Sequence, residues 1–355
     1  MNDSSSLIYE YNPSIEVSYS KEAVKGLSLF GLHEYSVGDS SYAAYINQRD
    51  LSLNIMSFDR PNDPPQKIML NDSLFSVSKN GSISSIALDN NKMAFAQYKQ
   101  FGIYNLNTHQ MEFLKPMEGT DSLPIYYNYR VKAPMNFNDE KGELLIPCSD
   151  FRQKGDFMMD LSFQCQVNTQ TGYSSTIPVK YPETFEQELG TSAFESFSYK
   201  GTDTILYNFS MEDYFLIYDK TKSTTIKVNA RSKYHKNIEP LDSTDLQDPD
   251  KWSEHFVTSF VYSHILYDKW RKCYYRIYAK NQSLRRDDGY FNTERDKTKG
   301  VIVINSDLEI IGEFELPKSN NFNYSVINKG LLFTVPKKDT ILDNKINYGA
   351  ISIKL

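Results

Sequence analysis

Aromatic and arginine side chains gather in three long segments of the sequence: 124–130 (PIYYNYR), 229–259 and 280–299. Aromatic faces combined with guanidinium groups suit sugars, carboxylated glycans and peptides, because guanidinium groups bind carboxylates through paired hydrogen bonds. We therefore predict ligand-binding residues in these segments: Tyr126, Tyr127, Arg130, Trp252, His255, Arg285, Arg286, Tyr290 and Arg295. The alternative is that the aromatic side chains pack the loops and that the arginines pair with Asp287 and Asp288 in solvent.

Acid–base catalysis is the alternative chemistry. Two carboxylates that converge within about 5 to 9 Å, with a histidine nearby, would suit a glycan hydrolase or lyase. The candidate carboxylates are Glu183, Glu186, Glu188, Asp287 and Asp288. The chain contains no HExxH, GxSxG, P-loop, EF-hand or GxGxxG motif, and its nearest histidine pair, His255 and His264, is nine residues apart. We therefore predict no catalytic residue, no metal site and no cofactor.

The composition favours β-structure and argues against nucleic acid as a ligand. The 355 residues carry a net charge of −6, and they include 26 Tyr and 21 Phe but only 2 Trp. Aromatic and β-branched residues fit pleated, half-buried sheets, whereas nucleic-acid binders are usually basic. No apolar run reaches the roughly 18 to 20 residues that span a bilayer. The polar start, MNDSSSLIYE, fits either the tether of an exported protein or an ordinary cytoplasmic start.

One pattern recurs along the chain: an alternating apolar run, a polar turn and a second alternating run. The turn residues that we align are Asp59, Asn107, Asn168, Asp219 and Asn305, at steps of 48, 61, 51 and 86 residues. Asp and Asn suit such turns because they tolerate left-handed backbone. A period of about 40 to 50 residues with four strands per unit is typical of propeller blades.

The repeats predict a six-bladed β-propeller of four-stranded antiparallel blades. Five units cover approximately 34–70, 83–114, 134–180, 194–228 and 263–316. The last unit has three strands, so we expect Ser14–Ser20 to supply its outer strand and close the ring. Residues 1–13 would then be a tether and 14–355 a single domain. A seventh blade within 230–260 and a stack of β-sandwiches are the alternatives.

Insertions fall at one end of the predicted blades. Turns between the first and second strands of a unit, and between the third and fourth, are short. The long segments are 116–133, 148–162, 181–192, 229–259, 280–299 and 337–346. They all join second to third strands, or one blade to the next, so they would emerge on one face. Long loops on a rigid scaffold usually carry function, which places the predicted ligand-binding residues on this face.

The three cysteines give no disulfide framework. Cys148 and Cys165 lie nearly symmetrically about the Gly155-Asp156 loop, so they are expected to face each other across two strands. We expect buried free thiols, because a disulfide would need an oxidising compartment.

The stretches CYYRIY (273–278), GVIVIN (300–305), IGEFELP (311–317) and KGLLF (329–333) occur in this order. They resemble the carboxy-terminal half of an uncharacterised, domain-of-unknown-function family of exported, lipid-anchored β-propeller proteins of Bacteroidetes. The resemblance covers about 270–335. It implies a lipoprotein of the cell envelope whose signal and lipidated cysteine precede Met1, and it brings no catalytic residues. The repeat motifs of the WD40, kelch and sialidase propellers are missing.

We predict a noncatalytic, monomeric binding protein of the cell envelope, in the periplasm or at the cell surface. It would recognise a glycan, peptide or protein partner on its long-loop face and meet the membrane only through an amino-terminal lipid anchor. The alternatives are an envelope glycan hydrolase or lyase and a purely structural protein-interaction module.

Overall fold

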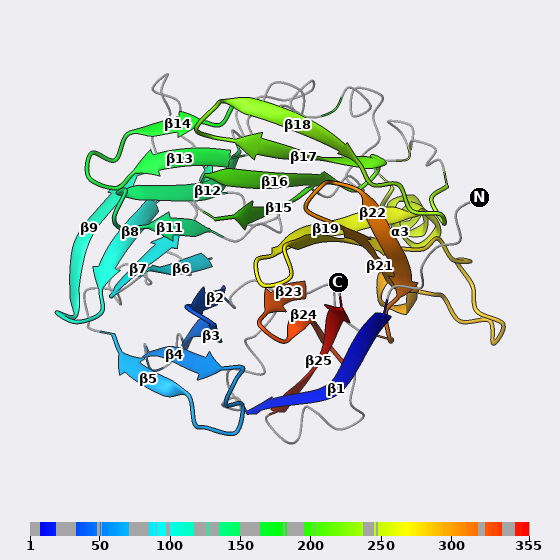
Figure 1. Ribbon diagram of the computed structural model, residues 1–355, viewed down its shortest axis with the longest axis horizontal. Helices are drawn as coiled ribbons and strands as arrows, with labels where there is room; N and C mark the ends of the chain where they lie inside the picture. Colours follow the sequence, from blue (N-terminus) through cyan, green and yellow to red (C-terminus); the bar gives the residue numbers. More distant parts are fainter. Residues whose placement is uncertain are drawn as a thin grey trace. The chain divides into compact units, whose positions relative to one another are not determined.

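The computed structural model describes most of the chain (Figure 1). The described residues are 8–18, 33–47, 50, 52–70, 85–89, 91–96, 100–116, 126–127, 135–149, 164–179, 182, 195–201, 203–236, 245, 248–318, 324–335 and 345–354. Within them, no helix is long and apolar enough to cross a membrane.

The described strands form six antiparallel sheets, which are the blades of a six-bladed β-propeller. The first contains β2 (His33–Val37), β3 (Ser40–Asn47), β4 (Ser52–Ser57) and β5 (Gln66–Met69). The second contains β6 (Ser85–Asp89), β7 (Lys92–Ala96), β8 (Gln100–Asn105) and β9 (Gln110–Pro116). The third contains β11 (Asn136–Asn138), β12 (Glu143–Ser149), β13 (Gln164–Asn168) and β14 (Ser174–Thr176).

The fourth blade contains β15 (Glu195–Lys200), β16 (Thr204–Phe209), β17 (Tyr214–Asp219) and β18 (Thr224–Asn229). The fifth contains β19 (Val261–Asp268), β20 (Cys273–Ala279), β21 (Lys299–Ile304) and β22 (Ile310–Glu315). The sixth contains β23 (Tyr324–Ile327), β24 (Gly330–Thr334), β25 (Lys345–Lys354) and, on its outer side, β1 (Ile8–Ser18). The predicted fold class and the predicted closure by the amino-terminal strand are confirmed. The strand begins at Ile8, six residues before the expected start at Ser14.

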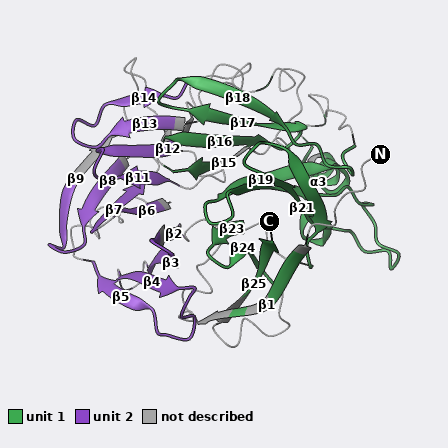
Figure 2. Ribbon diagram, in the orientation of Figure 1, with its two compact units in different colours: residues 1–16, 182–355 green, residues 17–181 purple. Residues whose placement is uncertain are grey.

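The chain divides into two compact units of three blades each (Figure 2). Residues 17–181 hold the first three blades, and residues 1–16 with 182–355 hold the last three. The described cores lie between neighbouring blades of one unit. One joins the first and second blades, one the second and third, one the fourth and fifth, and one the fifth and sixth. Both faces of a blade's central strands are therefore covered, which explains why β20 and β21 are buried along their whole length.

An Asx or Ser turn joins the third and fourth strands in each of the first five blades. Asn168, Asp219 and Asn305 accept hydrogen bonds from backbone N–H groups two to four residues later, at 2.9–3.2 Å. The predicted turn residues Asp59 and Asn107 lie in these turns, two positions after the residues whose side chains accept the hydrogen bonds. The residues that accept these bonds are Ser57 and Asn105.

A left-handed residue completes most of these turns. It is Gly172 in the third blade, but His109, Ser223 and Leu308 elsewhere, with φ between 51 and 67°. Side chains other than glycine and asparagine are strained in this region. The turn geometry therefore overrides residue preference in three of the blades.

A buried guanidinium group links the fourth and fifth blades. Arg276 of β20 is fully buried, and its guanidinium carbon lies 3.6 Å from the centre of the Tyr262 ring. Its nitrogens donate to the side chain of Asn208 at 2.9 Å and to the carbonyls of Ala230, Glu212 and Tyr214 at 3.0, 2.6 and 2.8 Å. Burial lowers its pKa to about 10, so it remains charged at neutral pH. The arginine of the CYYRIY stretch is therefore structural.

Two glycines of the same stretches are required by close packing. A Cβ on Gly300 would lie 2.3 Å from the hydroxyl of Tyr278, the residue opposite it in β20. A Cβ on Gly330 would lie 2.0 Å from the carbonyl oxygen of Ile351, and the φ of Gly330 is +121°. These positions specify how the fifth and sixth blades pack and carry no reactive group.

The described connections follow the predicted asymmetry. First-to-second and third-to-fourth turns are short apart from residues 58–65, whereas long connections join β12 to β13, β20 to β21 and β24 to β25. Several second-to-third connections are nevertheless short, including residues 210–213 between β16 and β17. The fifth blade carries the long connection that the structure describes throughout, at 280–298.

Candidate binding site on the fifth blade

Helix α3 (Pro249–Thr258) lies at the end of the connection between the fourth and fifth blades. Asp248 caps it and accepts the N–H groups of Asp250 and Lys251 at 2.9 and 3.4 Å, and Pro249 occupies the first turn. Phe256 is 5 % exposed and packs inward, so the carboxy-terminal turn is held against the blade.

Residues 283–292 form a short two-stranded ribbon, which we call the rim hairpin. In Figure 1 it belongs to the connection between β20 and β21 that extends at the right-hand side. Arg286 N–H donates to the carbonyl of Tyr290 at 2.8 Å, and Asn292 N–H donates to that of Leu284 at 2.7 Å. Gly289 (φ +86°) allows the tight turn. The ribbon is therefore held by its own backbone hydrogen bonds.

The two faces of the rim hairpin each carry one arginine and one aromatic residue. Arg285 lies opposite Phe291, and its guanidinium carbon is 4.3 Å from the centre of the phenyl ring. Arg286 lies opposite Tyr290 on the other face, because successive side chains of a strand alternate. The Arg286 side chain turns away from Tyr290 to the Asn292 amide oxygen at 3.3 Å and to Asp296 at 3.2 Å.

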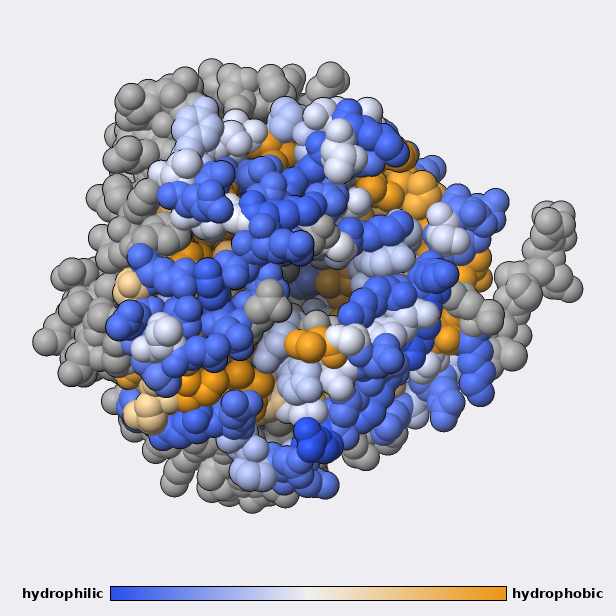
Figure 3. All heavy atoms as spheres, turned by 60° about the vertical axis from the view of Figure 1, so that its left-hand side comes forward, coloured by the Kyte–Doolittle hydropathy of each residue, from blue (hydrophilic) through white to orange (hydrophobic). Residues whose placement is uncertain are grey.

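The arrangement leaves Tyr290 uncovered. It is 72 % exposed, and Phe291 is 54 % exposed. Eight large hydrophobic side chains are exposed among the described residues, and these two are the one pair adjacent in sequence. On the surface seen in Figure 3, hydrophilic residues predominate and hydrophobic ones lie in separate patches between them. Exposed apolar residues that are scattered singly over a surface are normal, and Tyr290 and Phe291 differ from the others in being adjacent on one ribbon.

Asp296 ties the rim hairpin to the blade. It lies in the 3-10 helix η4 (Glu294–Asp296) and accepts the N–H and the hydroxyl of Thr293 at 2.9 and 2.7 Å. These bonds, reinforced by Arg286, lower the pKa of the Asp296 carboxyl below its usual value. The carboxylate therefore stabilises the base of the hairpin in its charged form.

Lys297 follows directly and is 3 % exposed. Its amine donates to the carbonyls of Phe256 and Ser259, at the carboxy-terminal end of α3, at 2.8 and 2.5 Å. Burial lowers the pKa of Lys297 to about 7, and burial together with Lys297 lowers the pKa of His255. The hairpin base and α3 are thus joined through one buried amine.

The predicted site residues fall in both compact units. Trp252, His255, Arg285, Arg286, Tyr290 and Arg295 belong to one unit, and Tyr126, Tyr127 and Arg130 belong to the other. The structure brings together the hairpin residues, with Arg295 exposed in η4 and His255 half-buried in α3. The Trp252 side chain and all of Arg130 lie outside the described residues.

The expectation that Tyr126 and Tyr127 lie in a loop is wrong. They form the two-residue strand β10 (Tyr126–Tyr127), which pairs with Ser149 and Cys148 at the end of β12. The alternative, in which the arginines pair with Asp287 and Asp288, is wrong for Arg286, whose ion-pair partner is Asp296.

Phe291 and Lys297 are the residues that the sequence interpretation did not select. The signal for Phe291 was present, because Asp288-Gly289 between alternating residues is typical of a tight hairpin. Nothing in the local sequence distinguishes Lys297 from its neighbours Arg295 and Lys299.

Two of the five candidate carboxylates lie in the described part of the chain. Asp287 and Asp288 are exposed at the tip of the hairpin, and Glu183, Glu186 and Glu188 lie outside the described residues. Within the described part of the chain, no three His, Cys, Asp or Glu side chains are placed to hold a metal ion.

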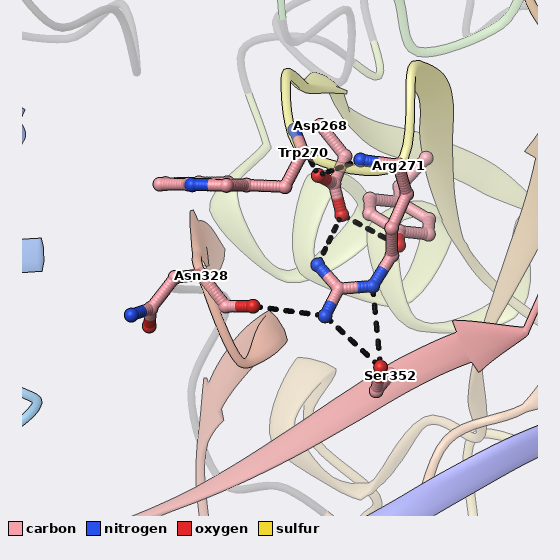
Figure 4. A network of polar contacts seen from close by, with 6 residues as sticks. Asp268, Trp270, Arg271, Asn328 and Ser352 are labelled. Atoms are coloured by element: carbon pink, nitrogen blue, oxygen red, sulfur yellow. Dashed lines mark hydrogen bonds and ion pairs between the residues drawn. The ribbon is translucent and has the colours of Figure 1, made fainter. Parts of the chain in front are cut away.

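Among the carboxylates that the structure describes, Asp268 is the most buried, and it accepts four hydrogen bonds (Figure 4). It accepts the N–H groups of Trp270 and Arg271 at 3.0 and 2.9 Å, the Arg271 guanidinium at 3.0 Å and the Tyr275 hydroxyl at 2.9 Å. Arg271 also reaches the Asn328 carbonyl and the Ser352 hydroxyl of the sixth blade, each at 2.9 Å. The network joins the fifth and sixth blades.

The cysteines differ from expectation. Cys165 is disulfide-bonded, so the expected free thiol is wrong at this position, and the Cys148 side chain lies outside the described atoms. Cys273 is a buried free thiol, and burial raises its pKa to about 11, which keeps it unreactive.

The six blades define the protein as a β-propeller, and its sequence matches a known family. Residues 76–315 match the family described as domain of unknown function DUF4221, and the chain belongs to it. A search of the curated proteins found no match to the chain.

Two solved structures are similar in fold. One is the crystal structure of a DUF4221 member from Bacteroides vulgatus ATCC 8482, with a TM-score of 0.76, 17 % identity and 99 % of each chain covered. The other is from Bacteroides fragilis NCTC 9343 and is named as a candidate exported protein. Its TM-score is 0.54, with 11 % identity, and 100 % of this chain and 97 % of that chain are covered.

Proposed function

We propose that this protein is an exported, noncatalytic binding protein that engages its ligand through the rim hairpin of the fifth blade. The observation that carries the proposal is the exposure of Tyr290 and Phe291, 72 and 54 %, on a ribbon held by backbone hydrogen bonds. Tyrosine and arginine are the residue types that most often dominate interface energies. An ordered ribbon loses little conformational entropy on binding, so the contact area contributes more fully to affinity.

The alternation of the ribbon favours a peptide or protein ligand over a glycan. Sugar rings stack on aromatic faces, and a flat platform would need Tyr290 and Phe291 on one side. Here they lie on opposite sides, each with an arginine across the ribbon. A projecting ribbon with an aromatic residue on each face fits a groove whose two walls it can contact. Glycans remain an outcome of the test.

Export is supported by two observations. A structural relative is named as a candidate exported protein, and Cys165 is disulfide-bonded, as is usual in oxidising compartments. In the proposed form the chain is a lipoprotein of the periplasm or cell surface, anchored by a lipidated cysteine ahead of Met1.

The test is a thermal-shift screen of the protein against panels of defined peptides and glycans. A ligand that binds the native state raises the Tm by mass action. The Tyr290→Ser/Phe291→Ser variant should lose the shift. Tyr173→Ser, which removes a tyrosine that is 62 % exposed in the β13–β14 turn, should retain it. Both changes replace exposed side chains, so folding should be preserved.

Three outcomes would overturn parts of the proposal. A hit that both variants retain places the site elsewhere. A hit that is consumed, with new products in solution, makes the protein an enzyme, and the hydrolase or lyase alternative then replaces binding. A hit confined to glycans contradicts the preference for a peptide or protein ligand.

A further inference from the structure

Lys297 occupies an unusual position for a lysine. Its amine is almost completely buried and ends at two backbone carbonyls, Phe256 at 2.8 Å and Ser259 at 2.5 Å. These carbonyls lie at the carboxy-terminal end of α3, where the last carbonyls of a helix lack intrahelical partners. The lysine therefore satisfies groups that would otherwise be buried without a donor.

The number of acceptors matches a neutral amine. A neutral amine has two N–H groups, and the described acceptors of Lys297 are these two carbonyls. An ammonium group adds a third N–H and a full charge in a site closed to water, where a charge is costly. Proton uptake therefore disfavours the buried position of the side chain.

The surrounding groups act in both directions. His255 on α3 and Lys299 on β21 oppose a positive charge at Lys297. Glu294 on η4 and the Phe256 ring, whose centre lies 5.4 Å from the amine, favour it. Glu294 also faces the buried phenol of Tyr324 on β23, and the Tyr324 ring packs edge-on against His264 of β19 at 5.2 Å. In acid, His255 gains a proton as well, so two positive charges then accumulate at the end of α3.

The peptide backbone joins this amine to the rim hairpin. Asp296, the neighbour of Lys297, accepts the guanidinium group of Arg286 at 3.2 Å and the N–H of Thr293 at 2.9 Å. A shift of Lys297 out of its site moves Asp296 with it, and the hairpin base loses its anchor.

We propose that Lys297 is a proton-sensitive contact, which we call the pin, between α3 and the base of the rim hairpin. As an uncharged amine it holds α3 against the hairpin base, and on protonation it releases α3 from the hairpin base. Acid then loosens the rim, and neutral to alkaline solution orders it. An effect of this loosening on ligand binding rests on the proposed function. The loosening of the rim hairpin does not rest on it.

The test is hydrogen exchange of the backbone amides of residues 256–259 and 284–292, from pH 5.5 to 8.5, corrected for the intrinsic effect of pH. We expect their protection to rise at least tenfold over this range in the wild-type protein. Lys297→Met should remove the rise. Lys227→Met, which changes an exposed lysine of β18, should keep it. His255→Gln should keep most of it, which separates the lysine from the histidine.

Protection that is independent of pH in the wild type, or an unchanged rise in Lys297→Met, would overturn the proposal. If Lys297→Met does not fold, NMR titration of the wild-type protein with labelled lysine side chains decides. An Nζ that titrates near pH 7 supports the pin, and one that titrates above 9.5 refutes it. Neither readout uses a ligand, so failure of the pin and failure of the proposed function are distinguishable.

Discussion

Replacing Arg276 by methionine should destabilise the unit that holds the last three blades. The change keeps the length and apolar stem of the side chain but removes its donors to Ala230, Glu212 and Tyr214, all within 3.0 Å. A buried polar group that loses its partner costs about 1–3 kcal/mol. Three such carbonyls therefore cost roughly 3–5 kcal/mol, after the gain from no longer burying a charge is subtracted.

Thermal unfolding followed by circular dichroism measures this effect. For a unit of this size, where each kcal/mol shifts the Tm by about 2–4 °C, a loss of 3–5 kcal/mol lowers the Tm by roughly 6–20 °C. The Tm of Arg276→Lys should lie between those of the wild type and Arg276→Met, because an ammonium group reaches at most three acceptors and loses the stacking on Tyr262. The matched control is Arg231→Met, an exposed arginine in the same region, which should change stability by less than about 0.5 kcal/mol. An Arg276→Met variant as stable as this control would refute the reasoning.

Three further predictions concern packing, turn geometry and pH. Gly300→Ala should cost at least about 2 kcal/mol in thermal unfolding, because its Cβ would lie 2.3 Å from the Tyr278 hydroxyl. Ser223→Gly should stabilise by up to about 1 kcal/mol in the same assay, because it relieves a φ of +51°. The ring of His33 accepts the N–H of Leu88 at 3.2 Å, and burial lowers its pKa to about 4. Since the unfolded chain binds this proton more tightly, stability present above pH 6.5 should be lost as the pH falls towards 4, by roughly 1–2 kcal/mol.

Each of these predictions has a control and a contrary result. Gly201→Ala meets no neighbour within 4 Å but has a φ of +70°, so it should cost only the backbone strain. Equal losses at Gly201 and Gly300 would contradict the packing argument. A loss of stability in Ser223→Gly would contradict the strain argument. His33→Gln should reduce the loss of stability between pH 6.5 and 4, and His109→Gln, in an exposed turn, should leave that loss unchanged. If both variants lose the same stability over this pH range, His33 is not the cause.

The fold was predictable because each blade repeats the same local choices. The predicted fourth unit, 194–228, agrees to within one residue at each end with the observed blade, which runs from Glu195 to Asn229. The turn residues were harder, because Asn105 and Asn107 are equally suited to the turn and the hydrogen-bond register decides between them. β10 was missed because two residues are too short to show alternation.

The candidate site was only half predictable. Its loop and its aromatic and arginine residues are visible in the sequence, and Asp288-Gly289 indicates the hairpin. The sequence does not show which arginine forms an ion pair within the protein, because the partner of Arg286 is Asp296, ten positions away. The burial of Lys297 could not be inferred either, since lysine is almost always exposed and its partners come from a different connection.

Site-specific photocrosslinking of the full chain in the cells that produce it tests the central claim most directly. A photoreactive residue would replace Tyr290 or Phe291, with Tyr173 as the matched exposed control. The account predicts a light-dependent covalent adduct of one defined mass at both hairpin positions and none at Tyr173. Adducts that are absent from the hairpin, or equal at all three positions, would contradict the claim that the rim hairpin is the binding surface.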